Sequence, residues 1–277
     1  MSTFRRRFLE NKTAVACLVI LCLLAACALL APMIAPHDPT EMFQDHRMEG
    51  SSVQFWLGTD QFGRDLFSRI VYGAQVSLVV GLSSVFVSVV FGALFGLIAG
   101  YFGRWVDGFI MRVMDVLFAF PEILLALAIV AALGPGTINT ILAIGIVNIP
   151  IFTRTVRGAV LAVKNLEFVE SARAIGANTP RILFLEIFPN VTAPLLVQAS
   201  LAISGAILTE SALSFLGLGI QPPDPSWGGM ISEARRYMEL APGMIIWPCA
   251  AMTVTILSFN MFGDAVRDIL DPRHRSK

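Results

Sequence analysis

Charge and histidine are scarce in this sequence. Only 14% of its 277 residues are charged, whereas soluble domains carry about 25%. The three histidines, His37, His46 and His274, all lie outside the long apolar runs. This placement argues against an intramembrane protease that depends on histidine and against a haem protein with paired axial histidines. Lys and Arg balance Asp and Glu at 20 each, so the net charge indicates no nucleic-acid partner, and none is expected.

Motifs for catalysis and for nucleotide binding are missing as well. The chain contains no H-E-x-x-H, no G-x-S-x-G and no G-x-x-x-x-G-K-S/T, so it has no phosphate-binding loop of its own. The cysteines lie inside apolar runs without metal-ligand spacing, and we expect buried free thiols there. They are Cys17, Cys22, Cys27 and Cys249. We therefore expect no catalytic residue, no cofactor and no metal in this chain.

Long uncharged apolar runs are what the sequence has in abundance. Hydrophobic residues make up 56% of the chain and the mean hydropathy is +0.72, which favours an all-α polytopic membrane protein. The run 123–153 exceeds one span and contains the turn signal Gly134-Pro135-Gly136, so it is divided between two helices. Six transmembrane helices result, at 14–34, 70–103, about 113–133, 138 to about 156, 187–218 and 240–263.

The first apolar run has an alternative interpretation as a secretion signal. Arg5-Arg6-Arg7 followed by Leu24-Ala25-Ala26-Cys27 is similar to a bacterial lipoprotein cleavage site. The run continues past Cys27 to Ile34, however, and its 21 residues are long enough to span a bilayer. We therefore predict a retained membrane anchor.

The distribution of Lys and Arg predicts the orientation in the membrane. With a cytoplasmic N-terminus, the inner segments contain fifteen of these residues and the outer segments contain five, which supports six spans with both termini in the cytoplasm. Both outer segments are rich in Pro, Gly and aromatics and are expected to be packed caps. The predicted division is a cytoplasmic tail (1–12), a first transmembrane helix (13–35), an outer segment (36–69), a core (70–266) with a cytoplasmic loop (157–190) and an outer loop (219–239), and a cytoplasmic tail (267–277).

Polar residues deep inside the spans are candidate functional residues, because lipid disfavours them. Glu210 lies deepest, and the sequence leaves open whether it faces a translocation pathway or bonds to a neighbouring helix. Asn148, which lies near Pro150, and Asn260 are weaker pathway candidates, for which helix packing is the alternative.

Other features of the spans have simpler explanations. Asp115 and Glu122 occupy the first three turns of the third span, where interfacial placement or an ion pair of Asp115 with Arg112 is expected. Gly96 and Gly100 form a G-x-x-x-G pattern in the second span, which predicts close packing against another helix.

The cytoplasmic loop contains a polar stretch, ESARAIGANTPRILFLEIFPN, that favours two short helices. The residues before Gly176 are good helix formers and place Phe168, Ala172 and Ile175 on one face. Gly176 is positioned for a left-handed helix end, and Thr179, followed by proline, is expected to cap a second helix. The small-faced first helix suits a groove on another protein better than a lipid surface, which would require more Trp, Leu and basic residues.

These residues also resemble a known family pattern. The order Glu170-Ser171-Ala172, Gly176 and Pro189 resembles the E-A-A…G…P loop of ABC-importer membrane subunits, with mild departures at Ser171, Glu186 and Phe188. Further stretches, in the same order, are similar to the "C"-type subunit of the dipeptide and oligopeptide permease branch. They include Trp56-Leu57-Gly58-Thr59-Asp60, Gly63-Arg64-Asp65, Phe120-Pro121, Ser214-Phe215-Leu216-Gly217-Leu218-Gly219 and Pro225-Ser226-Trp227-Gly228.

The resemblance implies a type I ABC-importer permease fold in the cytoplasmic (inner) membrane of a bacterium or archaeon. It implies a homologous second permease subunit around one pathway, two cytoplasmic ATPase subunits that hold ATP and Mg, and an outer solute-binding protein. The loop 157–190 would then be a coupling loop that contacts an ATPase. Its contact residues would be Glu170, Ser171, Ala172, Arg173, Ala174 and Gly176.

The cargo implied by the resemblance is a di- or oligopeptide, with a nickel complex, glutathione or another small solute as alternatives. A secondary transporter that acts alone is a competing interpretation. Such proteins are often built from repeated halves with ionisable residues at the midplane, and no internal repeat is visible in this sequence.

Overall fold

Five helices of the computed structural model are long and apolar enough to cross a membrane, and one bent pair forms a candidate sixth span. The structure describes residues 8–270 and has no strand within them, so the prediction of an all-α membrane protein is confirmed. The long helices are α2 (Lys12–Leu29), α4 (Leu66–Phe102), α7 (Thr137–Val163), α10 (Phe188–Phe215) and α12 (Gly243–Leu270).

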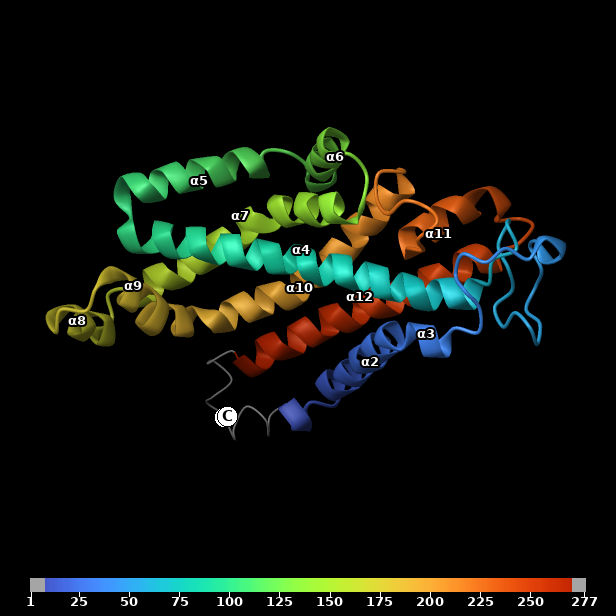
Figure 1. The fold of residues 1–277 in the computed structure, drawn as a ribbon. Helices are drawn as coiled ribbons and strands as arrows, with labels where there is room; N and C mark the ends of the chain where they lie inside the picture. The colour runs from blue at the N-terminus through green and yellow to red at the C-terminus, as the bar shows by residue number, and fades with distance from the viewer. Residues whose placement is uncertain (1–7, 271–277) are drawn as a thin grey trace.

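Shorter elements connect these helices (Figure 1). They are α3 (Ala31–Ile34), η1 (Gln44–His46), α5 (Arg104–Phe118), α6 (Glu122–Leu133), α8 (Glu167–Ala174), α9 (Thr179–Arg181), the π-type turn η2 (Ile182–Ile187), α11 (Trp227–Ala234) and η3 (Arg235–Tyr237). The predicted cytoplasmic loop, 157–190, is therefore mostly helical, and α7 extends into it as far as Val163.

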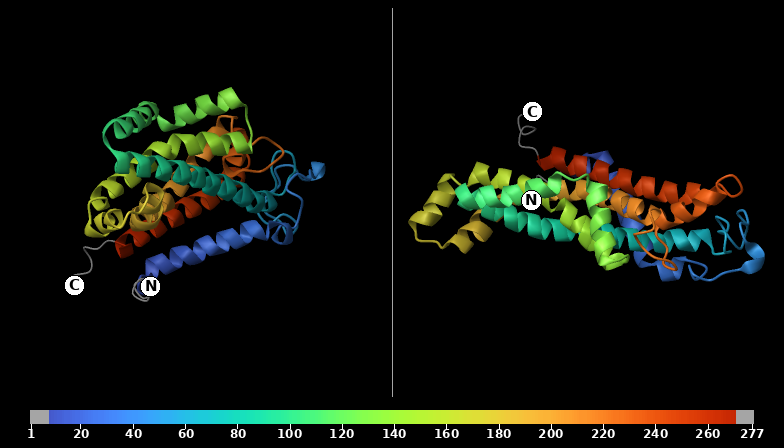
Figure 2. Two further views of the ribbon diagram at one scale, coloured as in Figure 1. Left: turned by 60° about the vertical axis from the view of Figure 1, so that its left-hand side comes forward. Right: turned by 90° about the horizontal axis from the view of Figure 1, so that it is seen from above.

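The third predicted span is not one continuous helix. α5 and α6 meet at 91°, so the prediction that Asp115 and Glu122 share a helix is wrong. The break precedes α6 at Pro121, which has no N–H to donate and which disfavours helical geometry at Phe120. Both Figure 1 and Figure 2 show α6 running across the bundle, whereas α5 runs along it.

Glycine allows α4 and α7 to pack closely. A Cβ atom at Gly96 would lie 2.7 Å from the carbonyl oxygen of Thr153 and 2.7 Å from Cβ of Val156. A Cβ atom at Gly100 would likewise lie 2.7 Å from Cβ of Val160. The close packing predicted from the G-x-x-x-G pattern is confirmed, and α7 is the partner helix.

Replacing Gly96 by leucine is expected to lower the free energy of unfolding by at least ~2 kcal/mol, because the new side chain must displace the backbone of α7. The thermal midpoint of the purified chain in detergent measures this effect. Gly108→Leu on α5 is the matched control, since a Cβ atom at Gly108 meets nothing within 4 Å. Equal midpoints for the two variants would contradict the packing described above.

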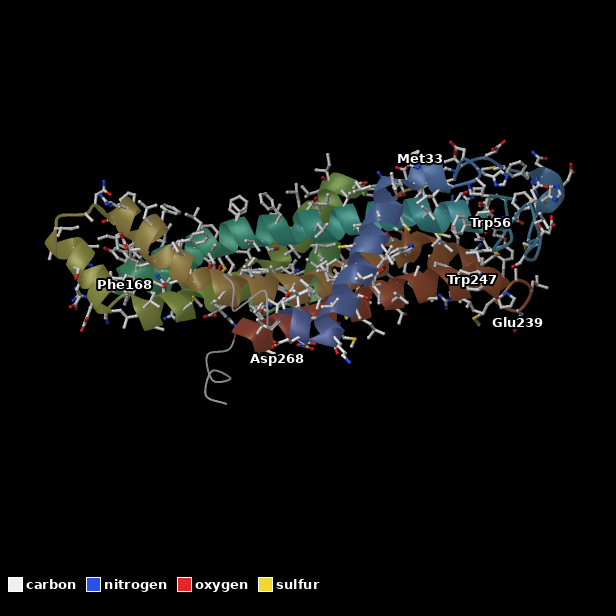
Figure 3. The ribbon with its side chains drawn as sticks, turned by 90° about the horizontal axis from the view of Figure 1, so that it is seen from below. Met33, Trp56, Phe168, Glu239, Trp247 and Asp268 are labelled. Carbon is white, nitrogen blue, oxygen red and sulfur yellow. The ribbon has the colours of Figure 1, made fainter. Side chains whose placement is uncertain are left out.

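Segments predicted to share one side of the membrane lie at the same end of the bundle. The hairpin α8–α9 and the α4–α5 turn lie at one end, toward which α2 begins and α12 ends (Figures 1 and 2). The opposite end carries α11 and the segment 36–65. Figure 3 accordingly places Phe168 at one end and Trp56 and Glu239 at the other.

The segment 36–65 has little regular structure but is well packed. Phe55 is fully buried, and the rings of His37, Phe43 and His46 lie with their centroids 5.2, 5.2 and 5.4 Å from its own. The expectation of a packed cap is confirmed for this segment.

Candidate coupling site

The polar segment between α7 and α10 forms a helical hairpin. At the end of α8, the Ala177 N–H donates to the Ala172 carbonyl at 3.0 Å, and the Gly176 N–H donates to the Arg173 carbonyl at 3.0 Å. This pair of bonds is the Schellman arrangement that closes many helices. Gly176 has a φ of +81°, in the left-handed region that favours glycine. The elbow predicted at Gly176 is confirmed.

The second arm of the hairpin starts one residue earlier than predicted. Asn178, and not Thr179, is the N-cap, because its Oδ1 accepts a hydrogen bond from the Arg181 N–H at 3.1 Å. The π-type turn η2 then leads into Pro189 near the start of α10. Since proline cannot donate an N–H, regular α-helical bonding is interrupted there, and the wider turn lets the helix continue.

The face by which α8 packs also differs from the prediction. Val169 and Ala172 are buried and belong to the main apolar cluster, which includes residues of η2. Phe168 and Ile175 were expected on the same face as Ala172, yet their side chains are 36% and 80% exposed. The i, i+3 pair Val169 and Ala172 therefore packs α8 against the main apolar cluster, and the opposite side of the helix stays exposed.

We call the free side of α8 and its elbow the coupling surface. It comprises the exposed residues Phe168, Glu170, Ser171, Arg173, Ala174, Ile175 and Gly176. Glu167 and Glu170 lie in the first turn of α8, where negative charge is favourable to the helix dipole. Of the predicted contact residues only Ala172 is buried. The coupling surface combines exposed apolar groups with charged groups, a composition that suits insertion into a groove on another protein.

Polar contacts at the base of the hairpin fix its position against the bundle. Lys164 Nζ donates to a backbone carbonyl near the end of α4 at 2.8 Å. The Arg173 guanidinium lies 5.3 Å from the centroid of the Tyr101 ring, also in α4. Arg157 of α7 donates two hydrogen bonds to Asp107 of α5, at 2.5 and 2.7 Å. Arg173 thus connects α8 to α4, while Lys164 and Arg157 connect the end of α7 to α4 and α5.

The alternative that paired Asp115 with Arg112 is wrong. Arg154 Nη2 donates to Asp115 Oδ1 at 2.7 Å, so the ion pair joins α5 to α7 instead of forming with Arg112 inside α5. Glu122 accepts a 3.2 Å hydrogen bond from the hydroxyl of Thr209 and connects α6 to α10.

Glu210 lies in the interior of this chain. Its side chain is fully buried, and the Ser214 hydroxyl donates to it at 2.7 Å. The hydroxyls of Ser77 and Ser211 lie 3.4 Å from its other oxygen, and Ser77 belongs to α4. The Ser77 contact joins α10 to α4, so the carboxyl group bonds to a neighbouring helix and has no exposed surface in this chain.

Asn148 and Asn260 are half-buried on α7 and α12. Asn148 Nδ2 donates to the Ile144 carbonyl of its own helix at 3.0 Å, and Asn260 Oδ1 accepts from the Ser204 hydroxyl at 2.6 Å. The bonding partners of these residues and of Glu210 all differ, so the structure does not gather the three into one polar cluster.

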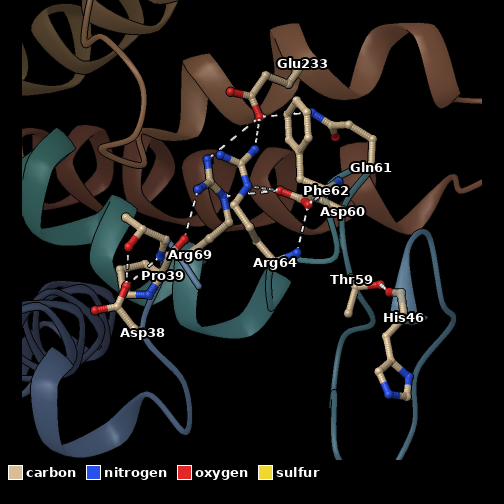
Figure 4. Close-up of polar contacts among 11 residues, drawn as sticks. Asp38, Pro39, His46, Thr59, Asp60, Gln61, Phe62, Arg64, Arg69 and Glu233 are labelled. Carbon is tan, nitrogen blue, oxygen red and sulfur yellow. Dashed lines mark hydrogen bonds and ion pairs between the residues drawn. The ribbon is translucent and has the colours of Figure 1, made fainter. Parts of the chain in front are cut away.

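A buried ionic network at the opposite end was missed by sequence reasoning (Figure 4). Arg64 donates to Asp60 and to Glu233, each at 2.5 Å. Arg69 lies 3.7 Å from Asp60 and 3.8 Å from Glu233, and it donates to the Pro39 carbonyl at 3.0 Å. Both arginine side chains are only 3% exposed.

This network links the N-terminal segment 36–69 to α11, which lies much later in the sequence. Glu233 lies on α11, 169 residues after Arg64, so no local pattern in the sequence could indicate the pairing. The Gly63-Arg64-Asp65 motif was noted only as part of the family resemblance, and no ion pair was predicted for it.

Comparison with known proteins agrees with this architecture. Residues 92–276, more than half of the chain, match the family described as "Binding-protein-dependent transport system inner membrane component". The chain belongs to this family. Residues 1–50 of the permease match the "N-terminal TM domain of oligopeptide transport permease C". The protein is thus a membrane-spanning permease subunit of an ABC importer.

The similarity of this permease to its relatives extends over nearly its whole length. The di/tripeptide transport system permease DppC of Pseudomonas aeruginosa is 46% identical, covering 99% of this chain and 92% of the relative. The dipeptide transport system permease DppC of Alkalihalophilus pseudofirmus is 46% identical over 96% of this chain and 88% of the relative. The glutathione transport system permease GsiD of Pectobacterium atrosepticum is 47% identical over 99% of this chain and 91% of the relative.

A solved structure shares the fold of the permease. It is a chain of the MetNI methionine ABC transporter in an inward-facing conformation, with a TM-score of 0.59 and 17% identity. The similarity covers 73% of this permease and 97% of that chain.

Proposed function

We propose that this permease imports di- or oligopeptides that an outer solute-binding protein delivers to it. Two of its relatives carry names that specify di/tripeptide or dipeptide transport, and they match 99% and 96% of this chain. The permease pairs with a homologous second subunit around one pathway and contacts two ATPase subunits that bind ATP and Mg. Its six membrane crossings place both termini in the cytoplasm, in agreement with the fifteen Lys and Arg residues on the inner side.

The coupling surface is the observation that supports this proposal most directly. It lies at one end of the bundle and leaves Phe168, Glu170 and Ile175 exposed, while Val169 and Ala172 hold the hairpin in place. We propose that each ATPase receives such a hairpin in a surface groove. ATP binding brings the two ATPases together, the hairpins move with them as rigid bodies, and the pathway opens outward. The free energy for this step comes from the preference of ATP for the closed state.

We propose a structural role for Glu210 and keep Asn148 and Asn260 as candidate pathway residues. The buried carboxyl group of Glu210 joins α10 to α4 through serine hydroxyls, whereas the two asparagines remain partly exposed.

Reconstitution of the complete importer in proteoliposomes tests the proposed function. We expect ATP-driven uptake of a labelled dipeptide that requires the ATPases, the second permease and the binding protein together. Uptake by the isolated chain would contradict the coupled mechanism. Uptake of glutathione, but of no dipeptide, would keep the mechanism and change the cargo.

A charge reversal on the coupling surface separates docking from general damage. Glu170→Lys is expected to weaken ATPase binding and to reduce dipeptide uptake about fivefold or more, because a charge-assisted contact contributes about 1.5–3 kcal/mol. The retained ATPase in a detergent pull-down measures this directly. Glu239→Lys, also exposed but at the opposite end of the bundle, is the matched control and should behave like the parent.

A further inference from the structure

A groove between the first and last helices lies on the periphery of the bundle. It has a volume of about 520 Å³ and is lined by residues of α2 and α12 alone. The lining residues are Lys12, Thr13, Ala16, Cys17 and Ile20 of α2, and Val254, Leu257, Ser258 and Met261 of α12. On each helix they recur every three or four residues, or lie beside one another, so each set forms one continuous face.

The groove has one charged end. Lys12 is the only charged residue of its lining and is the first residue of α2, at the end where α12 finishes. Thr13 lies beside it, and the hydroxyl of Ser258 is already bonded to the Val254 carbonyl at 2.7 Å. Beyond this end the walls are apolar. An occupant that matches the groove therefore has one anionic end and an apolar body.

The length of the groove matches one leaflet of a bilayer. From Lys12 to Ile20, α2 rises about 12 Å at 1.5 Å per residue. Half of a hydrocarbon core that is about 30 Å thick is about 15 Å. A helix of another subunit would be expected to contact α2 along its whole length, whereas an acyl chain anchored at Lys12 ends near the middle of the bilayer.

We propose that this groove binds one anionic phospholipid, from the leaflet that faces the Lys12 end of the bundle. Its phosphate pairs with the Lys12 ammonium group, and one acyl chain lies between α2 and α12. Arg5, Arg6 and Arg7 precede Lys12 in the sequence, and a basic segment of this kind attracts anionic headgroups to the membrane surface. The bound lipid would fasten the first helix to the core of the permease.

Native mass spectrometry of the complete importer tests this proposal. The complex is purified in mild detergent and equilibrated with equal amounts of phosphatidylglycerol and phosphatidylcholine that carry the same acyl chains. We expect the parent to retain phosphatidylglycerol in preference to phosphatidylcholine by about fivefold, the effect of one cation near an anionic surface. Lys12→Glu should remove this preference, and Lys12→Arg should keep it.

Two tryptophan variants separate the groove from the rest of the helix surface. Ala16→Trp fills the groove and should abolish the retained lipid, whereas Val19→Trp, which is exposed on α2 outside the groove, should leave it unchanged. Equal retention of phosphatidylglycerol by the parent, Lys12→Glu and Ala16→Trp would overturn the proposal. Loss of the second permease subunit from the Ala16→Trp complex would also overturn it, by identifying the groove as a subunit interface. None of these readouts depends on the cargo.

Discussion

ATP-driven uptake is expected to fall about tenfold or more when Gly176 is replaced by valine. Gly176 ends α8 with a φ of +81°. In this left-handed region the conformational free energy of a residue with a side chain is roughly 1–2 kcal/mol higher, and that of a β-branched residue is higher still. A Cβ atom at this position meets nothing within 4 Å, so the effect is conformational and not a clash. Under the proposed mechanism, the strained elbow then no longer presents Glu170 and Ile175 in the geometry that the ATPase groove requires. Dipeptide uptake by the reconstituted importer measures the loss, at matched amounts of inserted permease.

Two control variants make this prediction specific. Gly158→Val places the same side chain in equally open space but on the regular helix α7, and it should transport like the parent. Gly176→Asn should retain most of the uptake, because asparagine tolerates the left-handed region better than other residues. If Gly176→Val imports dipeptide as fast as Gly158→Val, then the elbow is not part of the coupling machinery.

Removing the guanidinium group of Arg64 is expected to cost about 3–5 kcal/mol of stability. Arg64→Ala leaves the carboxylates of Asp60 and Glu233 without their closest cation, and Asp60 is almost fully buried. Arg69 remains 3.7 Å from Asp60 but makes no hydrogen bond to it. The thermal midpoint of the purified chain should fall by several degrees, and protease sensitivity should increase within the segment 36–65.

The matched control and a double variant test whether the buried pairs are responsible. Arg47→Ala changes an exposed arginine of the same outer segment and should leave the midpoint unchanged. Arg64→Ala combined with Glu233→Gln should recover part of the loss, since one of the two unpaired charges is then removed. A midpoint for Arg64→Ala equal to that of Arg47→Ala would show that the network contributes little.

The coupling segment illustrates how far local rules extend. The left-handed position of Gly176 and the two helices around it follow from glycine and proline chemistry within a few residues, and they were predicted. The packed face of α8 was not, because Phe168 and Val169 are equally apolar and only the position of η2 decides which one is buried.

Partners distant in the chain were beyond sequence reasoning. Pairing of Asp115 with Arg112, one turn away, was one of two alternatives, but the partner in the structure is Arg154, 39 residues further along. A helix-period pattern indicates which residues are close within a helix, but it contains no information on which helix lies opposite. For the same reason the pairing of Arg64 with Glu233 could not be predicted from the sequence.

The sequence by itself determined that this chain is a helical membrane protein, where its long helices lie and where the chain turns at Gly176. Length, hydropathy and the conformational limits of glycine and proline act locally, so they can be read without a structure. Only the tertiary structure decided that α5 and α6 meet at 91°, that Glu210 is surrounded by serine hydroxyls, and that Arg64 holds the segment 36–65 to α11. These features depend on which helices meet and how closely, and that is set by the packing of the whole bundle.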